Sequence, residues 1–145
     1  MNTIEIDKAL ANVPGFLGAH PFDSLPKKRT TDFSIVINTD SKKGEHWLGL
    51  VRKNNIYYFH DSYGRKPGDL LFTKQFRTTM RKYINAKCIS NTKWIQQITS
   101  NVCGMHSIYF IKEMQLRSFK KILSVFDNNL KNNDKYVVRY YKKYN

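Results

Sequence analysis

The segment GMHSIYFIKEMQL, residues 104 to 116, constrains the fold more than any other part of the chain. Its apolar residues lie on nearly every face of the helix that they predict, and such a helix is buried inside a protein. The other segments must therefore pack around it. With 145 residues, the chain is long enough to bury such a core in one domain, residues 1 to 145, without disulfides or metals.

The segments around this helix predict strands as well as helices. Residues 3–12 predict a short helix that ends at Pro14 and Gly15, and a turn-rich segment follows at 15–26. Alternating β-branched residues predict a strand at 32–39. Further predicted elements are a hairpin at 46–64, a helix at 69–85, a strand at 94–98, and helices at 119–130 and 136–145. This order of elements predicts an α+β fold.

Charge and cysteine content limit the classes of partner and compartment. Lysine and arginine number 25 against 11 acidic residues, and the net charge of +14 favours a polyanionic partner such as nucleic acid. A basic, solvated surface shaped by a Lys/Asn-rich genome would give the same charge. The two cysteines form no disulfide framework and no zinc-ligand spacing, which favours a reducing compartment.

The sequence contains no signal that we interpret as targeting. The N-terminal segment lacks a basic start followed by an apolar run, and no apolar stretch approaches the ~20 residues that cross a bilayer. We therefore expect a soluble, intracellular protein that has no membrane partner.

Cys103 lies where the polar segment TSN gives way to the buried helix. At a helix N-terminus, unpaired N–H groups and the positive end of the helix dipole favour a thiolate and lower a cysteine pKa from ~8.5 to between about 3.5 and 7.5. Gly104 leaves room for a substrate backbone. The position therefore predicts a nucleophile, although a lone cysteine also serves as a small apolar core residue.

A nucleophilic thiolate needs a base, and a third group must orient that base. If the hairpin turn centres on Lys53 and Asn54, His46 faces Asp61, with the Cβ atoms ~4.5 to 5.5 Å apart. A turn centred one residue later moves the pairing by two and keeps both side chains on one face of the sheet. His46 is thus the predicted base and Asp61 the group that holds its ring. A packing histidine and a turn-opening aspartate are the alternatives.

A glutamine is the last candidate catalytic residue, and two further histidines are assigned no catalytic role. Gln97 lies six residues before Cys103, and its amide can join the Cys103 backbone N–H in binding a developing oxyanion. Losing one such donor typically costs ~2.7 to 4 kcal/mol of barrier. Gln96 should point the other way, and either glutamine could instead be a polar strand residue. His60 should alternate to the opposite face of the hairpin, and His106 should pack in the core.

A His-Trp pair, an acidic residue, a glutamine and a Cys-Gly pair occur in the order His46, Asp61, Gln97 and Cys103. This order resembles the cysteine proteases of the adenain and deSUMOylating class. The segment QITSNVCG is similar to that family's block of Gln, five residues and Cys-Gly, and YYFHDSYG to its strand ending in Asp-Ser. GFLGAH and FSIVINT resemble the adenovirus maturation protease in particular. The resemblance covers about residues 14 to 112.

The resemblance implies a papain-like or adenain-like fold, in which a central mixed or antiparallel sheet packs against a helix that carries the nucleophile at its N-terminus. Cys103 would be the nucleophile, His46 the general base and then acid, Asp61 its orienting group and Gln97 the oxyanion donor. The implied function is that of a viral thiol protease, a hydrolase that cleaves capsid and core precursors during virion maturation. It would act in the virion and in the cytoplasm or nucleus of the infected cell.

No cofactor is required for this chemistry, but the family uses activators. DNA serves the adenovirus enzymes as a cofactor, which implies nucleic-acid binding through the basic surface here. Those enzymes are also activated by a peptide tethered through a cysteine, and Cys88 lies near the place of that cysteine; burial in the core is the alternative for Cys88. We expect a monomer, and the Lys/Asn-rich composition is similar to that of virophages or Maverick-type viruses.

Two other functions stay open at this point. The same residues serve isopeptidases that act on ubiquitin-like modifiers. A non-enzymatic, basic nucleic-acid-binding protein with a structural cysteine would have the same charge. Labelling of Cys103 by ubiquitin-like vinyl-sulfone probes would favour the isopeptidase, and inertness of Cys103 toward iodoacetamide would favour the binding protein.

Overall fold

The structure is a computed structural model, and it describes residues 1–40 and 46–145. Within these residues, one mixed sheet has the strand order β1-β2-β3-β4-β5. Its strands are β1 (Phe16–Pro21), β2 (Phe33–Asn38), β3 (Trp47–Lys53), β4 (Ile56–His60) and β5 (Cys88–Ser90). The outer pairs β1–β2 and β4–β5 are parallel, and β3 is antiparallel to both of its neighbours. The predicted α+β class is confirmed, and of the two expected sheet types, mixed or antiparallel, the mixed form is present.

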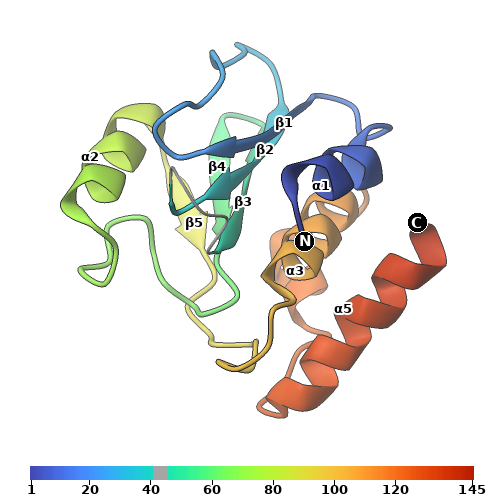
Figure 1. Cartoon of the computed structure of the whole chain (residues 1–145). Helices are drawn as coiled ribbons and strands as arrows, with labels where there is room; N and C mark the ends of the chain where they lie inside the picture. The colour runs from blue at the N-terminus through green and yellow to red at the C-terminus, as the bar shows by residue number, and fades with distance from the viewer. Residues whose placement is uncertain (41–45) are drawn as a thin grey trace.

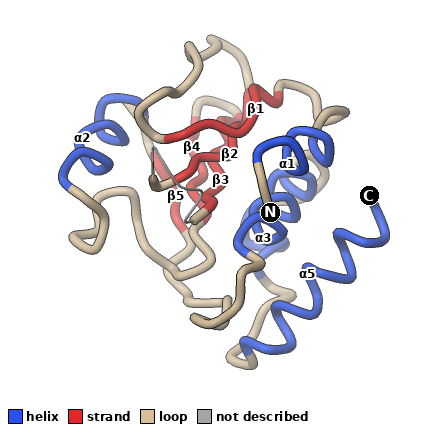
Figure 2. Tube along the Cα trace, viewed as in Figure 1, coloured by secondary structure: helices blue, strands red, loops and turns tan. Residues whose placement is uncertain are grey.

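Helices lie on both sides of this sheet (Figure 1). They are α1 (Thr3–Leu10), α2 (Lys74–Tyr83), α3 (Cys103–Met114), α4 (Phe119–Leu123) and α5 (Leu130–Tyr144). Helix α2 lies on one side, and α1, α3 and α5 lie on the other, as the helix and strand colours of Figure 2 also show. Among the helices of the described ranges, none is both long enough and apolar enough to cross a membrane.

The alternation of side chains along the strands produces two cores. Ile35, Leu50 and Phe59 belong to the cluster that packs against α2. Their neighbours along the chain, such as Val36 and Val51, belong to the cluster around α3. This is the period of two that strands impose, and every residue of β2 is buried because the sheet is covered on both faces.

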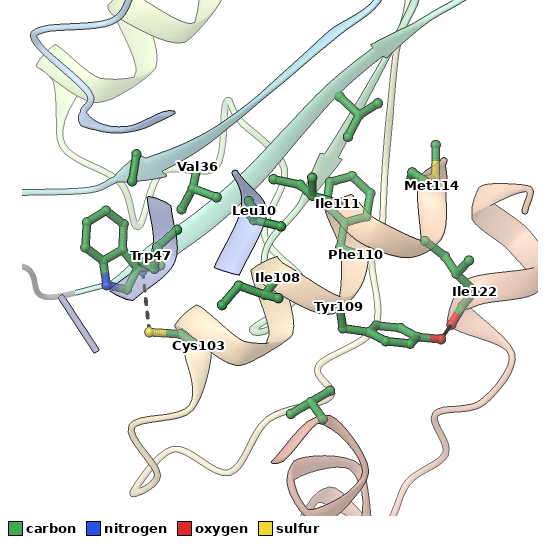
Figure 3. Close-up of a cluster of buried hydrophobic side chains, with 14 of the residues drawn as sticks. Leu10, Val36, Trp47, Cys103, Ile108, Tyr109, Phe110, Ile111, Met114 and Ile122 are labelled. Carbon is green, nitrogen blue, oxygen red and sulfur yellow. Dashed lines mark hydrogen bonds between the residues drawn. The ribbon is translucent and has the colours of Figure 1, made fainter. Parts of the chain in front are cut away.

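Helix α3 is the buried helix that its sequence predicts. Ten of its 12 residues are buried, and its side chains fill the core between the sheet and the other helices (Figure 3). Phe110 of α3 packs directly on β3 at Gly49, where a Cβ atom would collide with the Phe110 ring. Glycine at this position therefore sets how closely α3 approaches the sheet.

Two sequence predictions about strands are wrong. The segment predicted to be turn-rich contains β1, which is irregular between Phe16 and Ala19, where Gly18 adopts a φ of 103°. Gly18 thus marks an irregularity within a strand rather than the absence of one. The strand predicted at 94–98 is an irregular segment, and the last strand of the sheet is β5.

Helix boundaries also differ from the predictions. Helix α2 begins only at Lys74, because the Thr73 hydroxyl accepts a hydrogen bond from the Phe76 N–H and caps the helix there. The helix predicted at 119–130 ends at Leu123, and α5 begins at Leu130, six residues before its predicted start. The earlier start of α5 brings Asp134 into a helix, and this residue proves important for the site.

Candidate active site

The β3–β4 hairpin turns at Asn54 and Asn55, which have φ angles of 53° and 64°. Two consecutive left-handed residues make the tight turn that matches the twist of a hairpin, and asparagine tolerates this conformation. The turn therefore has the later of the two predicted centres, and Gly49 pairs with His60. As a result, His46 and Asp61 lie just beyond the strand ends as diagonal neighbours and are not directly opposed.

The side chains of His46 and Asp61 nevertheless meet. Nε2 of His46 lies 2.7 Å from Oδ1 of Asp61, and both residues are buried. The other carboxylate oxygen accepts a 2.6 Å hydrogen bond from Nε of Arg65, and the Tyr63 N–H donates to Oδ1 at 3.0 Å. Burial by itself raises the pKa of Asp61, but these bonds and the charges of His46 and Arg65 outweigh it and hold the pKa below its usual range.

Asn91 fixes the backbone of Asp61. Its Oδ1 accepts from the Asp61 N–H at 3.0 Å, and its Nδ2 donates to the Asp61 carbonyl at 2.6 Å. Asn91 directly follows β5, which lies beside β4 at the edge of the sheet. The residue that follows β5 thus fixes the backbone of Asp61, which follows β4.

An aromatic ring covers the imidazole. Tyr63 stacks on His46 with ring centroids 4.7 Å apart and an angle of 10° between the planes. Trp94 contacts the Tyr63 ring in turn, with centroids 5.0 Å apart. Because Asp61 holds one edge of the imidazole and Tyr63 covers its face, the ring has one orientation in the site.

Cys103 is the first residue of α3, as predicted. Its Sγ accepts a hydrogen bond of 3.4 Å from the Trp47 N–H (Figure 3). The residue before it, Val102, provides no side-chain cap, so the N–H groups of the first turn of α3 are not used by a capping side chain. Burial raises the pKa of Cys103, but His46 and the N–H groups of Trp47 and Gly104 outweigh it and lower the pKa.

His46 connects the carboxylate to the thiol. Its Nε2 is bonded to Asp61, and the ring also interacts electrostatically with the Cys103 thiol. With Nε2 engaged by Asp61, Nδ1 is the ring nitrogen available to the thiol. Burial lowers the pKa of His46, but the bonds and charges of Asp61 and Cys103 more than offset it and raise the pKa to about 9. With the Cys103 pKa lowered, the arrangement favours a thiolate–imidazolium pair.

The space beside Gly104 is filled. A Cβ atom at Gly104 would lie 2.9 Å from the sulfur of Met1, whose carbonyl also accepts a 3.1 Å hydrogen bond from the Trp47 indole. The expectation that Gly104 leaves room for a substrate backbone is therefore wrong for this arrangement. The missing side chain instead allows the N-terminal residue to pack against the start of α3.

The two glutamines before Cys103 have different surroundings. Gln96 is fully buried; its Oε1 accepts from the Ser62 hydroxyl, and its Nε2 donates to the Ser100 carbonyl at 3.1 Å. Gln97 is half-buried, and its Nε2 donates to Oδ2 of Asp134 at 3.2 Å. The two side chains do point to different partners, and the oxyanion role of Gln97 stays a prediction.

A cleft of about 690 Å³ opens beside the imidazole. His46, Tyr63 and Arg65 form part of its wall, and Phe72 and Phe76 make it apolar on the side of α2. The rest of its lining mixes polar and apolar side chains, and ligand sites are concave spaces of this kind with a few placed polar groups. The cleft places a ligand against the candidate base.

His60, His106 and Cys88 have surroundings different from those of the reactive pair. His60 is buried on the α3 side of the sheet, where its ring stacks on Phe110 with centroids 5.0 Å apart. His106 is fully buried in α3, so its predicted packing role is consistent with its position. Cys88 is a free, half-buried cysteine in β5, and burial raises its pKa. In the described part of the chain, no group of three or more His, Cys, Asp or Glu residues could hold a metal ion.

The structure thus brings Cys103, His46 and Asp61 together, and it adds residues that the sequence did not indicate. One feature of the sequence could have indicated Arg65: it carries a charge opposite to that of Asp61, four residues earlier. Tyr63 and Asn91 had no such feature, because an aromatic residue in a turn and an asparagine after a short strand have many roles.

Comparisons with known proteins do not assign the chain to a family. No protein-family model matches the sequence, and a search of curated proteins finds no match. The assignment of the site therefore rests on its residues and their geometry.

Proposed function

We propose that this chain is a cysteine endopeptidase of the adenain-like type, with Cys103 as nucleophile, His46 as general base and acid, and Asp61 as the group that orients His46. The observation that carries the proposal is that His46, bonded to Asp61 at 2.7 Å, interacts with Cys103 at the start of a buried helix. A structural cysteine needs neither a base nor a lowered pKa.

The geometry supports a two-step mechanism. The Cys103 thiolate attacks the carbonyl carbon of a peptide bond, and the carbonyl electron pair moves to oxygen, where the Cys103 N–H and the Gln97 amide would stabilise the oxyanion. When the tetrahedral intermediate collapses, the C–N bond breaks and the imidazolium of His46 gives its proton to the leaving amine. His46 then takes a proton from water as the hydroxide attacks the thioester, which releases the carboxylic acid and returns the thiolate.

The substrate class comes from the family resemblance in the sequence. We propose that the enzyme cleaves viral capsid and core precursors during virion maturation, with DNA as a stimulating partner bound by the +14 surface. A papain-like or adenain-like arrangement of the fold is part of the same proposal, and the mixed sheet packed on α3 is consistent with it.

Processing of a co-expressed capsid precursor tests this function. Wild type and the Cys88→Ala variant should process the precursor, whereas Cys103→Ala should not. Cys88→Ala is the matched control because it removes the other thiol of the chain. Equal processing by wild type and Cys103→Ala would contradict the proposal. Labelling of Cys103 by ubiquitin-like vinyl-sulfone probes would instead move the substrate class to ubiquitin-like modifiers.

A further inference from the structure

Asp134 of α5 connects three parts of the molecule around the candidate nucleophile. Its Oδ1 lies 3.0 Å from Nε2 of His106, one turn after Cys103 in α3. Its Oδ2 accepts from both the backbone N–H and the side-chain Nε2 of Gln97, at 3.3 and 3.2 Å. Asp134 is only 6% exposed, so these contacts are shielded from water. None of the steps of the proposed mechanism uses it.

The segment that Asp134 holds is the one that leads into the nucleophile. Residues 91–102 contain no helix or strand, so individual backbone and side-chain hydrogen bonds fix their position. On one side, the Ile95 N–H donates at 2.9 Å to the carbonyl of Ser62, the residue that directly follows Asp61. On the other side, Asp134 holds Gln97. An irregular segment fixed at both sides presents its polar groups in one arrangement.

The bond from Gln97 to Asp134 leaves the amide able to donate again. A carboxamide carries two N–H donors, and Asp134 accepts one of them. The second points in a direction that the first bond fixes, because the amide group is planar. Without Asp134, the Gln97 side chain could rotate freely at the edge of the loop, and an oxyanion would have to order it during the reaction.

The bond to His106 fixes Asp134 relative to α3. His106 is fully buried, and its other ring nitrogen, Nδ1, has no hydrogen-bond partner among the described residues. The bond to Asp134 is thus the hydrogen bond that holds this ring. Burial raises the pKa of Asp134, but the bonds to His106, Ser100 and Gln97 outweigh it and lower the pKa, so the carboxylate is ionised at neutral pH.

We propose that Asp134 is a positioning residue that aims the Gln97 amide at the oxyanion formed on attack by Cys103. This inference rests on the proposed function, because it needs Cys103 to form an acyl intermediate. It assigns a role in the reaction to α5, an element that carries none of the reacting groups.

Two reagents separate this role from a purely structural one. With p-nitrophenyl acetate, the Cys103 thiolate attacks the acetyl carbonyl carbon, an oxyanion forms, and the C–O bond breaks to release p-nitrophenolate with its electron pair. With iodoacetamide, the thiolate displaces iodide at carbon and no oxyanion forms. In a Cys88→Ala background, Asp134→Asn should slow acylation about tenfold to a hundredfold, the range that misplacement of a reacting group costs. The alkylation rate should be unchanged.

A double-mutant cycle tests whether Asp134 acts through Gln97. Gln97→Ala should slow acylation, and adding Asp134→Asn should cause no further loss, because the effect of Asp134 passes through the missing amide. Glu113→Gln is the matched control. Glu113 also links α3 to α5, through a 2.7 Å bond from the Tyr140 hydroxyl, but it does not hold Gln97. Both rates of this variant should equal those of the parent.

Three outcomes would overturn the inference. They are equal losses in acylation and alkylation, additive losses from Asp134→Asn and Gln97→Ala, and an Asp134→Asn variant that acylates normally. If Asp134→Asn does not fold by circular dichroism, Asp134→Glu replaces it, since it keeps the charge beside His106 and displaces the oxygen that Gln97 meets. A parent protein whose Cys103 reacts with neither reagent would instead contradict the proposed function itself.

Discussion

Nε2 of His46 lies 2.7 Å from Oδ1 of Asp61, although both residues lie one position outside the strands that bring them together. The pairing of β3 with β4 ends at Gly49 and His60. The paired strands therefore position the backbone near His46 and Asp61, but they do not constrain the two side chains. Arg65, Tyr63 and Asn91 supply that constraint. The site is thus assembled by turn residues on a rigid hairpin, as is common where chemistry is carried by loops.

The first prediction concerns the reactivity of the two cysteines. The pKa of Cys103 is lowered and that of Cys88 is raised, so iodoacetamide should alkylate Cys103 faster at neutral pH. Peptide mass spectrometry after timed alkylation measures both rates in one sample. His46→Gln should move the rise in Cys103 alkylation to higher pH. Equal rates for the two cysteines would contradict the assignment of a thiolate.

The second prediction concerns the pH dependence of turnover. Activity should rise with pH as Cys103 ionises below its ordinary range, and it should fall above about 9 as His46 loses its proton. Asp61→Asn removes a charge that raises the pKa of His46, so the alkaline limb should move to lower pH. The corresponding change in a serine triad lowers kcat about 10⁴-fold, and we expect a large loss here as well. An alkaline limb that does not move would show that Asp61 does not act on His46.

The third prediction separates the two glutamines. Gln96→Ala removes a fully buried amide and leaves Ser62 and Ser100 without their partner, so it should lower the free energy of unfolding by about 1–3 kcal/mol. Gln97→Ala should change stability little and slow acylation about 10²- to 10³-fold. Urea unfolding and p-nitrophenyl acetate kinetics measure the two effects. A folded Gln96→Ala protein that no longer acylates would transfer the oxyanion role to Gln96.

The fourth prediction concerns stability in acid. Burial, with a smaller effect of His106, lowers the pKa of His60 to about 3, far below the ~6.5 of an unfolded chain. Between these values only the unfolded chain binds this proton, so protonation of this group favours unfolding. The folding equilibrium constant should therefore fall by up to about tenfold for each pH unit from 6.5 toward 3. His60→Leu should flatten this loss, which urea unfolding across this pH range would detect. An unchanged pH slope would contradict the low pKa of His60.

The parts of the fold that the sequence predicts well are those where one physical preference dominates. Helix α3 follows from an apolar segment that has no alternative to burial, and the hairpin follows from two alternating runs around asparagines. Strand β5 could not be found, because three residues contain too little periodicity to distinguish a strand from a loop. Segment 94–98 resembles a strand in composition, but the Ile95 and Gln96 N–H groups both donate to Ser62 and form no ladder.

The candidate site shows the same division. Cys103 could be predicted because it directly precedes the apolar helix segment. His46 and Asp61 could be predicted because the position of a hairpin turn determines which residues of its two strands lie on the same face. The Asp134 contact could not be predicted, since it depends on how α5 packs against α3 and lies 37 residues from Gln97 in the chain. Polar residues in the segment NNDK give no sign that Asn133 and Asp134 are buried; only the start of α5 at Leu130 turns Asp134 inward.

The parallel stack of Tyr63 on His46 gives the candidate base a spectroscopic signature of its own. With ring centroids 4.7 Å apart and planes 10° from parallel, the imidazole protons lie over the face of the tyrosine, where the ring current shields them. The substitution Tyr63→Leu should therefore move the carbon-bound protons of His46 downfield in a nuclear magnetic resonance spectrum. A single histidine can thus be followed in solution while it exchanges its proton with the thiol.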